Sequence, residues 1–319
     1  MTGLDATPAP RRIALLGGTG FVGTALAARL AADGHELRLL TRDPRRAAHL
    51  RVLPGVRVLR ADVHDEPALR RALEGCDTVI NLVGILNERG FSGRGFAAAH
   101  AELACRTVAA AVAVGATRLL HMSALGAAED GPSFYLRSKG VAERHVRAAP
   151  PTLAWTILRP SVIFGAGDSF MNRFAGLLRL SRGVIPLARA EARFAPVWVG
   201  DVAEAFARAL DDRTPEGAPL PGGTTQGRSY DLCGPEVFTL AALVRLAGEW
   251  SGTPAHVLPL PDWAARLQAR VMDFVPGKPF STDNYRSLTV DNVSDHDGCA
   301  PLGITPASLR AIGPGYLRR

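Results

Sequence analysis

Short apolar runs alternate with longer stretches of helical periodicity from Arg12 to Pro160. This alternation is typical of βαβ units built around a parallel sheet, with right-handed crossovers between successive strands. The longer stretches predict helices near residues 21–32, 65–73, 92–114 and 134–148. The short runs predict six strands, at Ile13–Leu16, Glu36–Leu40, Val56–Arg60, Thr78–Val83, Arg118–Met122 and Thr156–Leu158.

After Pro160 the alternation becomes less regular, and glycine and proline become frequent, above all between Pro215 and Gly227. The pattern still predicts three elements: a helix around Phe238–Trp250, a strand near His256–Leu258, and a helix at Asp262–Met272 with prolines at its boundaries. These elements predict a smaller lobe packed on the first part of the chain.

The chain of 319 residues therefore predicts an α/β protein with a Rossmann doubly wound parallel sheet and a smaller C-terminal α/β lobe. We expect three parts. They are a flexible N-terminus at 1–11, an NAD(P)-binding core at 12–160, and a substrate or partner lobe at 161–319 with elements that return to the core.

A glycine-rich turn joins the first predicted strand to the first predicted helix. Glycines at this point allow a tight turn and let backbone N–H groups approach a pyrophosphate, whose charge the helix N-terminus stabilises. The spacing alone is weak evidence, but its position between strand and helix predicts a dinucleotide site rather than an ordinary loop. The predicted contacts are Gly17, Thr19, Gly20, Phe21, Val22 and Gly23.

The end of the second predicted strand distinguishes NADP from NAD, since a base there accepts the extra phosphate and an acid binds the ribose. The residues are Arg42, Asp43 and Pro44. Asp43 followed by Pro44 is typical of a helix N-cap with proline at the first helical position. Arg42 is then the predicted phosphate ligand, and the cofactor NADP(H) rather than NAD(H). In the alternative, Arg42 is a solvated surface residue and Asp43 faces the ribose.

Residues that follow the third and fourth strands are also cofactor candidates. Ligands bind at the carboxyl ends of strands in open α/β sheets, although each residue alone is more often a simple strand end. The candidates are Asp62, Val63, Leu82, Val83 and Gly84.

Tyr135 and Lys139 are four residues apart on a predicted helix and so share one face. Only Lys139 and Lys278 are lysines in a chain with 37 basic side chains, which makes the pair conspicuous. An ammonium beside a phenol favours the phenolate, so we expect Lys139 to lower the pKa of Tyr135 and make it a general acid or base. Ser123, after the fifth strand, is expected to bind the same substrate oxygen. The plain alternative is a surface contact and a loop serine.

Composition excludes several classes of function. The net charge of +7 is spread over dispersed arginines, and aromatic residues make up only 6% of the chain, so no nucleic-acid partner is expected. The four cysteines form no C-x-x-C pair and the histidines are scattered, so no metal site is expected. Neither a secretory signal nor a membrane-spanning run is recognised, which predicts a cytoplasmic protein.

The motifs together resemble the extended or atypical short-chain dehydrogenases/reductases, and within them the group around the NADPH-binding accessory subunit of respiratory complex I and its bacterial relatives. The resemblance covers most of the chain in the family's order. The segments are Gly-Gly-Thr-Gly-Phe-Val-Gly (17–23), Asn-Leu-Val-Gly-Ile-Leu (81–86), His-Met-Ser-Ala-Leu-Gly (121–126), Tyr-Leu-Arg-Ser-Lys-Gly (135–140), Leu-Arg-Pro-Ser-Val-Ile-Phe-Gly (158–165), Pro-Val-Trp-Val-Gly-Asp-Val-Ala (196–203) and Pro-Gly-Lys-Pro-Phe-Ser-Thr-Asp-Asn (276–284).

By this resemblance Ser123, Tyr135 and Lys139 take the catalytic positions, while Pro160 and Ile163 lie beside the nicotinamide. One departure concerns His100, which stands about where many relatives carry an asparagine and so argues against the usual proton relay. The resemblance implies an oxidoreductase of a carbonyl or alcohol. It also leaves open a non-catalytic NADPH-binding subunit or assembly factor of a respiratory-membrane complex or quinone pathway, and an epimerase.

A further segment carries Phe170, Phe174, Leu177 and Leu178 on one helical face, with arginines beside it. This face is expected to belong to the core or the substrate lobe. In the alternative, this face contacts lipid. The possible partners are therefore a hydrophobic small-molecule substrate and, by a peripheral contact, the inner membrane or a respiratory complex.

Overall fold

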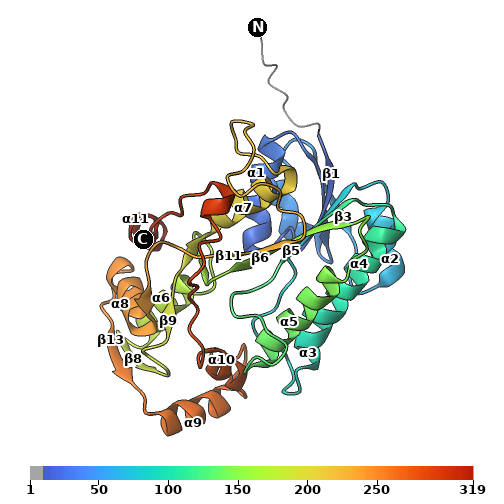
Figure 1. Cartoon of the computed structure of the whole chain (residues 1–319). Coiled ribbons are helices and arrows are strands. Elements are labelled where there is room, and N and C mark those ends of the chain that lie inside the picture. Colours follow the sequence, from blue (N-terminus) through green and yellow to red (C-terminus); the bar gives the residue numbers. More distant parts are fainter. Residues whose placement is uncertain (1–9, 319) are drawn as a thin grey trace.

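The computed structural model describes residues 10–318 and is built around a seven-stranded, wholly parallel sheet (Figure 1). Across the sheet the strands run in the order β11-β6-β5-β4-β1-β2-β3. Their bounds are β1 Arg12–Leu16, β2 Glu36–Thr41, β3 Val56–Arg60, β4 Thr78–Asn81, β5 Arg118–Met122, β6 Ala154–Pro160 and β11 Arg228–Leu232. The predicted doubly wound Rossmann sheet is confirmed.

All six predicted strands exist, and the sheet has one further strand; β1 and β2 are each one residue longer than predicted. β4 ends at Asn81 rather than at residue 83, because the Asn81 side chain accepts the N–H of Val83 and turns the chain away from the sheet. β6 is longer than predicted. β11 pairs in parallel with β6 and comes from the part of the chain after Pro160, so that part does return to the sheet.

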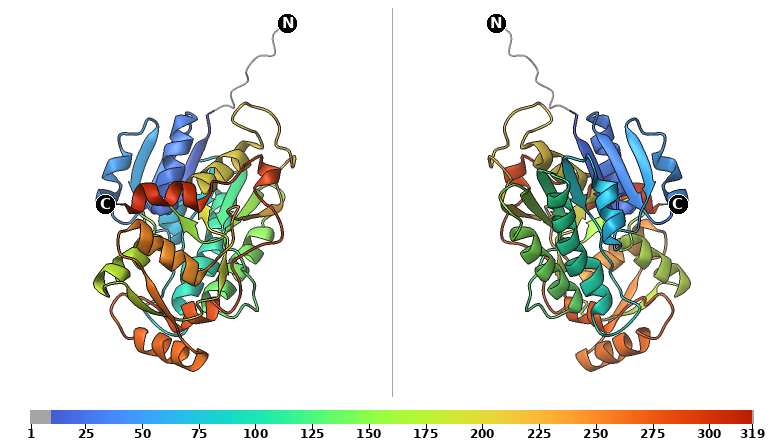
Figure 2. Two further views of the ribbon diagram at one scale, coloured as in Figure 1. Left: turned by 90° about the vertical axis from the view of Figure 1, so that its left-hand side faces the viewer. Right: turned by 90° about the vertical axis from the view of Figure 1, so that its right-hand side faces the viewer.

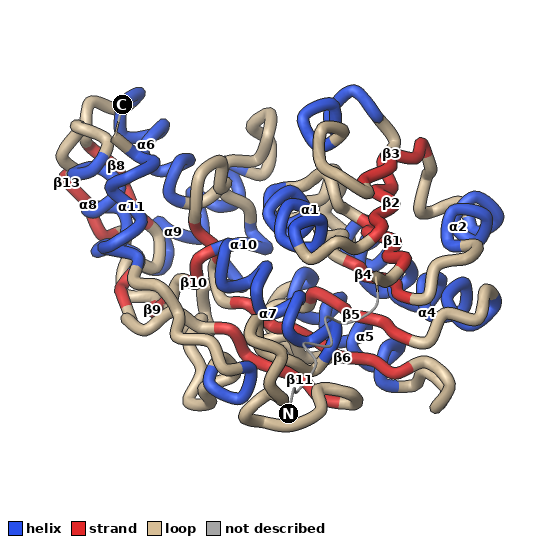
Figure 3. The backbone as a smooth tube through the Cα atoms, turned by 90° about the horizontal axis from the view of Figure 1, so that it is seen from above, coloured by secondary structure: helices blue, strands red, loops and turns tan. Residues whose placement is uncertain are grey.

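Helices cover both faces of the sheet, and each face has its own apolar core (Figure 3). One face carries α1 and α7 with the 3₁₀ helix η1, and the other carries α2, α4 and α5. The bounds are α1 Phe21–Ala32, η1 Pro44–Leu50, α2 Glu66–Leu73, α4 Leu103–Ala113, α5 Phe134–Arg147 and α7 Val199–Asp211. The Asp43 side chain accepts the N–H of Arg45, which confirms the predicted cap at the start of η1.

One continuous helix, Arg94–Ala113, is long and apolar enough to cross a membrane by length and composition alone. It consists of α3 Arg94–Phe96, the π-helical segment η2 Ala97–Glu102 and α4. Half of its most apolar stretch is buried, and α4 packs against α2 and α5 over the sheet. This burial is what the covering helix of an α/β sheet requires, so the apolar composition needs no membrane to explain it.

The second part of the chain forms a lobe at the carboxyl ends of the strands, with its own core (Figure 2). Three two-stranded sheets support it: β7 Ile163–Phe164 with β10 Val197–Trp198, β9 Arg193–Phe194 with β12 Phe238–Thr239, and β8 Val184–Leu187 with β13 His256–Pro259. Its helices are α6 Met171–Leu180, α8 Leu240–Trp250, α9 Asp262–Met272, α10 Thr282–Ser287 and α11 Leu309–Leu317. The 3₁₀ turn η3 Ala300–Leu302 instead packs in the core of the sheet domain beside α7.

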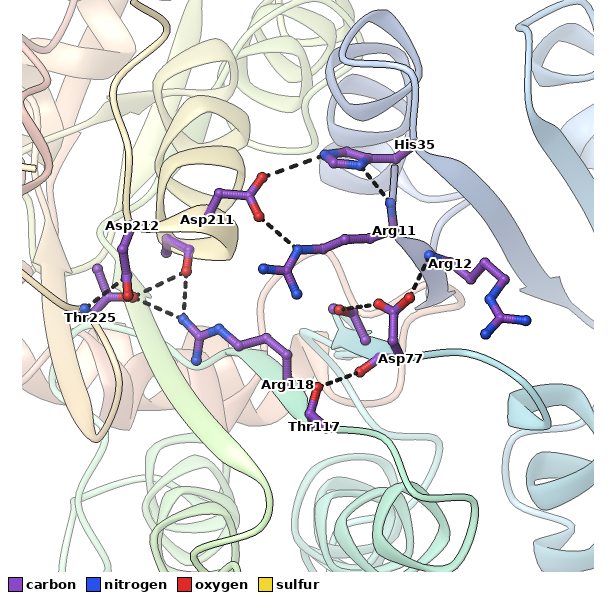
Figure 4. A network of polar contacts seen from close by, with 11 residues as sticks. Arg11, Arg12, His35, Asp77, Thr117, Arg118, Asp211, Asp212 and Thr225 are labelled. Carbon is purple, nitrogen blue, oxygen red and sulfur yellow. Dashed lines mark hydrogen bonds and ion pairs between the residues drawn. The ribbon is translucent and has the colours of Figure 1, made fainter. Parts of the chain in front are cut away.

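At the amino ends of the strands, buried polar side chains tie distant segments together (Figure 4). Arg118, at the start of β5, is almost fully buried and donates to Thr156 on β6 and Thr225 in the loop before β11. Arg11 donates to Asp211 at the end of α7. Of the predicted flexible N-terminus, residues 1–11, residues 1–9 lie outside the described residues. These hydrogen bonds join the strands to the neighbouring loop and helix at the edge of the sheet opposite the glycine turn.

Candidate functional site

The glycine turn lies between β1 and the start of α1, at the point where the strand order reverses between β1 and β4. Gly17 has φ +78°, in the left-handed region that glycine tolerates. A Cβ on Gly23 would lie 2.4 Å from the carbonyl oxygen of Gly17, so only glycine lets the helix approach the turn. Gly20 caps α1 without any side-chain hydrogen bond. Unsatisfied N–H groups at a helix start form an anion site, as pyrophosphate requires.

A large cavity of about 740 Å³ begins at this turn and extends into the lobe. Its volume falls in the range of cofactor and substrate sites. Most of the predicted site residues line it: Gly17, Gly20, Phe21, Val22, Gly23, Leu82, Gly84, Ser123, Tyr135, Lys139, Pro160 and Ile163. The structure thus brings segments from β1, β4, β5, α5 and β6 to one edge of the sheet.

The remaining predicted residues lie outside the cavity lining. Asp62 is exposed and accepts the N–H of His64, while Val63 and Val83 pack against the apolar core beneath the sheet. Thr19 is partly exposed in the turn. Arg42 is exposed directly after β2 and has no ion pair within the described residues. Their predicted cofactor contacts stay predictions.

Ser123 follows β5 directly and is 3% exposed, yet its hydroxyl has no hydrogen-bond partner within residues 10–318. A buried hydroxyl is normally satisfied, so an unpaired one in a cavity wall indicates that a ligand supplies the partner. Tyr135 lines the same cavity, half-buried, and its ring is held edge-on by Phe96 and His100, with ring centroids 6.1 and 5.5 Å away. Ser123 and Tyr135 therefore both belong to the wall of one cavity.

Lys139 is buried on α5, and its ammonium donates to the carbonyl oxygen of Met122 at 3.0 Å. Burial lowers the pKa of Lys139 to about 8, against a smaller upward effect of Glu143. The expected lowering of the Tyr135 pKa is wrong for this structure, because burial raises the pKa of Tyr135 to about 12. The ammonium turns toward Met122 rather than toward the phenol, so desolvation of the phenolate decides the direction.

His100 stands in the π-helical segment η2, and both its ring nitrogens are engaged. Nε2 accepts the N–H of Ile85 at 3.0 Å, so Nδ1 carries the proton and donates to Ser138 at 2.8 Å. Ser138 in turn donates to the carbonyl of Tyr135. Burial, and then the charge of Lys139, lower the pKa of His100 to about 2. His100 is therefore a fixed, neutral hydrogen-bonding residue, which agrees with the expected absence of a relay through this position.

The C-terminal segment at 276–284 completes the site, although only the family resemblance had singled it out. Asp283 accepts the N–H groups of Phe134 and Tyr135 at 2.6 and 3.1 Å, and so caps the helix that carries Tyr135. Asn284 donates to the carbonyl of Leu86 in the loop after β4. Further on, Asn292 accepts from the hydroxyl of Ser161 and from the N–H of Val162, next to Pro160. These contacts could not be found from spacing, because they join residues more than 125 positions apart.

The lobe half of the cavity is lined mainly by apolar side chains. Phe170, Phe174 and Leu177 of the predicted amphipathic face point into it, whereas Leu178 is buried in the lobe core. The face therefore serves the lobe and its cavity, as expected. Arg173, on the same helix, is a basic group of the wall and donates to the carbonyl of Lys278.

The fold and this site define an NAD(P)-binding Rossmann protein of the extended short-chain dehydrogenase/reductase type. Residues 17–169 match the model of the NAD(P)H-binding family. The chain is 30% identical over 300 residues to the mitochondrial "NADH dehydrogenase [ubiquinone] 1 alpha subcomplex subunit 9" of Arabidopsis thaliana, covering 88% of this chain and 71% of the relative. The chain belongs to the family of this complex I subunit.

Two further comparisons concern enzymes. A "ceramide reductase" of Caulobacter vibrioides is 34% identical over 200 residues, covering 62% of this chain and 60% of the relative. The structure of an NADPH-dependent quinone oxidoreductase from Escherichia coli, complexed with NADPH, superposes with a TM-score of 0.73 at 19% identity, over 96% of this chain and 99% of that chain. The latter similarity shows the shared fold alone.

Proposed function

We propose that this protein is an NADPH-dependent reductase of a lipophilic carbonyl compound. The observation that carries the proposal is the unpaired Ser123 hydroxyl beside Tyr135 in a cavity that joins the glycine turn to an apolar lobe. A substrate carbonyl oxygen that enters this space meets two hydroxyl donors. The name of the ceramide reductase relative supports a lipophilic substrate.

The residues fit a bound dinucleotide. The turn leaves no space for side chains at Gly17 and Gly23, and the start of α1 offers N–H groups without a side-chain cap to a diphosphate. Arg42 would hold the additional phosphate of NADP, since Asp43 is already engaged as a cap. Bound NADPH would supply a hydride for the carbonyl carbon.

The protein's own groups handle the proton. Burial raises the pKa of Tyr135 to about 12, so the phenol keeps its proton at neutral pH and would give it to the carbonyl oxygen as the alcohol forms. Ser123 orients that oxygen through its hydroxyl. Lys139, still mostly protonated near pH 7, provides the positive charge that a tyrosinate needs after the transfer.

The test is NADPH oxidation in the presence of long-chain ketones, aldehydes and quinones. Tyr135→Phe should lower turnover by about 10²- to 10⁴-fold while NADPH binding stays within about threefold. Tyr230→Phe is the matched control, because it removes a tyrosine hydroxyl from the sheet core rather than from the cavity. Undiminished turnover by Tyr135→Phe would remove the proposed acid from the mechanism.

A second candidate is a non-catalytic NADPH-holding subunit or assembly factor of a respiratory-membrane complex. The family membership favours it, because the relatives named as complex I subunits align over nearly the whole chain. It predicts tight NADPH binding, with none of the carbonyl or quinone compounds consuming the bound nucleotide. An epimerase fits less well, since a sugar nucleotide needs polar partners along its length and the lobe half of the cavity is mainly apolar.

A further inference from the structure

Helix α9 presents an apolar face to the outside of the lobe. Trp263 is 71% exposed and Phe274, in the turn after the helix, is 80% exposed, with Leu267 and Val271 between them also more than half exposed. The spacing of these residues places them on one side of the helix. The opposite side, with Ala265 and Ala269, is the buried one. This helix is therefore apolar on both sides, and only one side has a protein partner within residues 10–318.

The apolar face continues onto a neighbouring loop. The exposed ring of Phe91 stacks on Phe274 with a centroid distance of 5.5 Å. The Nζ atom of Lys278 lies over the Phe91 ring, 4.1 Å from its centroid, and donates to the carbonyl of Gly90. These contacts hold the loop beside α9. We call the set Phe91, Trp263, Leu267, Val271 and Phe274 the α9 face.

The cavity extends to α9. Gln268 and Met272 of this helix line the cavity. Leu86 and Leu180 also line it and are exposed, Leu180 to 84%, so the mouth of the cavity reaches the surface at these residues. Figure 1 shows α9 at the far end of the lobe, away from the central sheet and beside α10. The α9 face and part of the cavity wall therefore belong to the same helix.

The charges around the α9 face favour an anionic surface. Arg270 on α9, and Arg179 and Arg182 at the end of α6, are exposed and make no ion pair within the described residues. Asp262 of α9 pairs with Arg266, and Asp273 accepts a hydrogen bond from the hydroxyl of Thr282. An apolar helix face flanked by free arginines is the pattern of an interfacial helix on anionic lipid.

We propose that the α9 face docks on an anionic lipid bilayer and places the mouth of the cavity against it, so that a lipophilic substrate enters from the membrane. The route for the substrate rests on the proposed function, whereas the docking itself does not. The apolar side chains insert at the boundary between headgroups and acyl chains, and the arginines contact lipid phosphates.

The test is co-sedimentation of the full chain with phosphatidylcholine vesicles that contain about one-third phosphatidylglycerol, compared with phosphatidylcholine alone. We expect binding to the anionic vesicles, and a loss of about tenfold or more for Leu267→Gln combined with Phe274→Gln. Val52→Gln is the matched apolar control, because Val52 is 83% exposed in the sheet domain. Arg270→Gln should weaken binding about fivefold, and Arg57→Gln, an exposed arginine on β3, should not.

Two results would overturn the proposal: no binding to anionic vesicles, or equal binding by the wild type and the Leu267/Phe274 variant. Folding of that variant is checked by NADPH affinity and by reduction of a short, water-soluble carbonyl, both of which should be unchanged because neither Leu267 nor Phe274 lines the cavity. Loss of docking with retained reductase activity separates this inference from the proposed function. Docking without any reductase activity would overturn the proposed function and leave the docking surface intact.

Discussion

The carboxylate of Asp283 accepts the backbone N–H of Tyr135 at 3.1 Å and that of Phe134 at 2.6 Å. These N–H groups belong to the first turn of α5, where they have no partner within the helix. Asp283 lies almost 150 positions further along the chain, in α10. The orientation of the proposed acid is thus set by a side chain of the lobe rather than by its own helix alone.

Asp283→Ala should lower kcat by about tenfold and leave NADPH affinity nearly unchanged, because the start of α5 loses two acceptors and Tyr135 shifts relative to Ser123. Steady-state kinetics with direct NADPH titration separates the two effects. Asp65→Ala is the control: Asp65 caps α2 in the same way, away from the cavity. It should cost about 1 kcal/mol of stability with no change in kcat. Equal effects of the two variants on kcat would contradict a positioning role for Asp283.

The affinity of the free protein for NADPH should fall as the pH rises through about 8. Burial lowers the pKa of Lys139 to about 8, so its ammonium loses a proton there, and with it a charge and a donor near the nucleotide. Titration of NADPH fluorescence between about pH 6.5 and 9.5 measures the change. Lys139→Met should bind NADPH weakly at all these pH values, and a pH dependence that survives in this variant would assign it to another group.

Arg42→Ala should weaken NADPH binding about tenfold and leave NADH binding unchanged, because only NADPH carries the phosphate that the guanidinium would bind. Paired titrations with the two nucleotides measure this. Arg70→Ala, which removes an exposed arginine on α2, is the control and should change neither the NADPH affinity nor the NADH affinity. If Arg42→Ala left both affinities as they were, the phosphate ligand would have to be sought elsewhere.

Gly23→Ala should weaken NADPH binding by at least tenfold and destabilise the fold by about 1–3 kcal/mol. The added methyl group would lie 2.4 Å from the carbonyl oxygen of Gly17, so the turn must move away from the helix. Thermal unfolding and nucleotide titration check both effects. Gly315→Ala, in an exposed turn of α11 with open space around it, should be neutral or slightly stabilising.

Arg118→Met should destabilise the fold by about 2–4 kcal/mol, because the hydroxyls of Thr156 and Thr225 lose a buried donor. The catalytic constants of the folded fraction should not change, since Arg118 lies at the amino end of β5 and the cavity at the other. Chemical denaturation alongside kinetics measures the two. An Arg118→Met protein with wild-type stability would show that the network in Figure 4 contributes little.

The sheet and the glycine turn were predictable because they depend on local pattern. Apolar runs bounded by glycine and proline place β1 to β6, and Asp43 before Pro44 identifies the cap of η1. β11 was missed since its sequence, with Arg228 and Asp231, lacks the apolar run of a buried strand and lies at the sheet edge.

The site was predictable only where one segment carried its geometry. Tyr135 and Lys139 share a helix, so their spacing was informative. The carbonyl of Met122 that binds Lys139, and the carboxylate of Asp283 that caps α5, come together only through the tertiary fold. The predicted direction of the Tyr135 pKa shift was wrong for the same reason. The sequence shows that an ammonium is near, but it shows neither the rotamer of Lys139 nor the desolvation of the phenol in the cavity wall.

The hydrogen bonds of His100 affect the rate at which the proposed catalytic cycle could repeat. Since one ring nitrogen is taken by Ile85 and the other by Ser138, this side chain has no lone pair left with which to bring a fresh proton inward. In the proposed reduction, a tyrosinate formed at Tyr135 would then take its proton by a route other than His100, and on the cavity side the alcohol product would still be bound. A lipophilic product that excludes water from the cavity would also delay the reprotonation of Tyr135. Release of the product would then determine when the next catalytic cycle can begin.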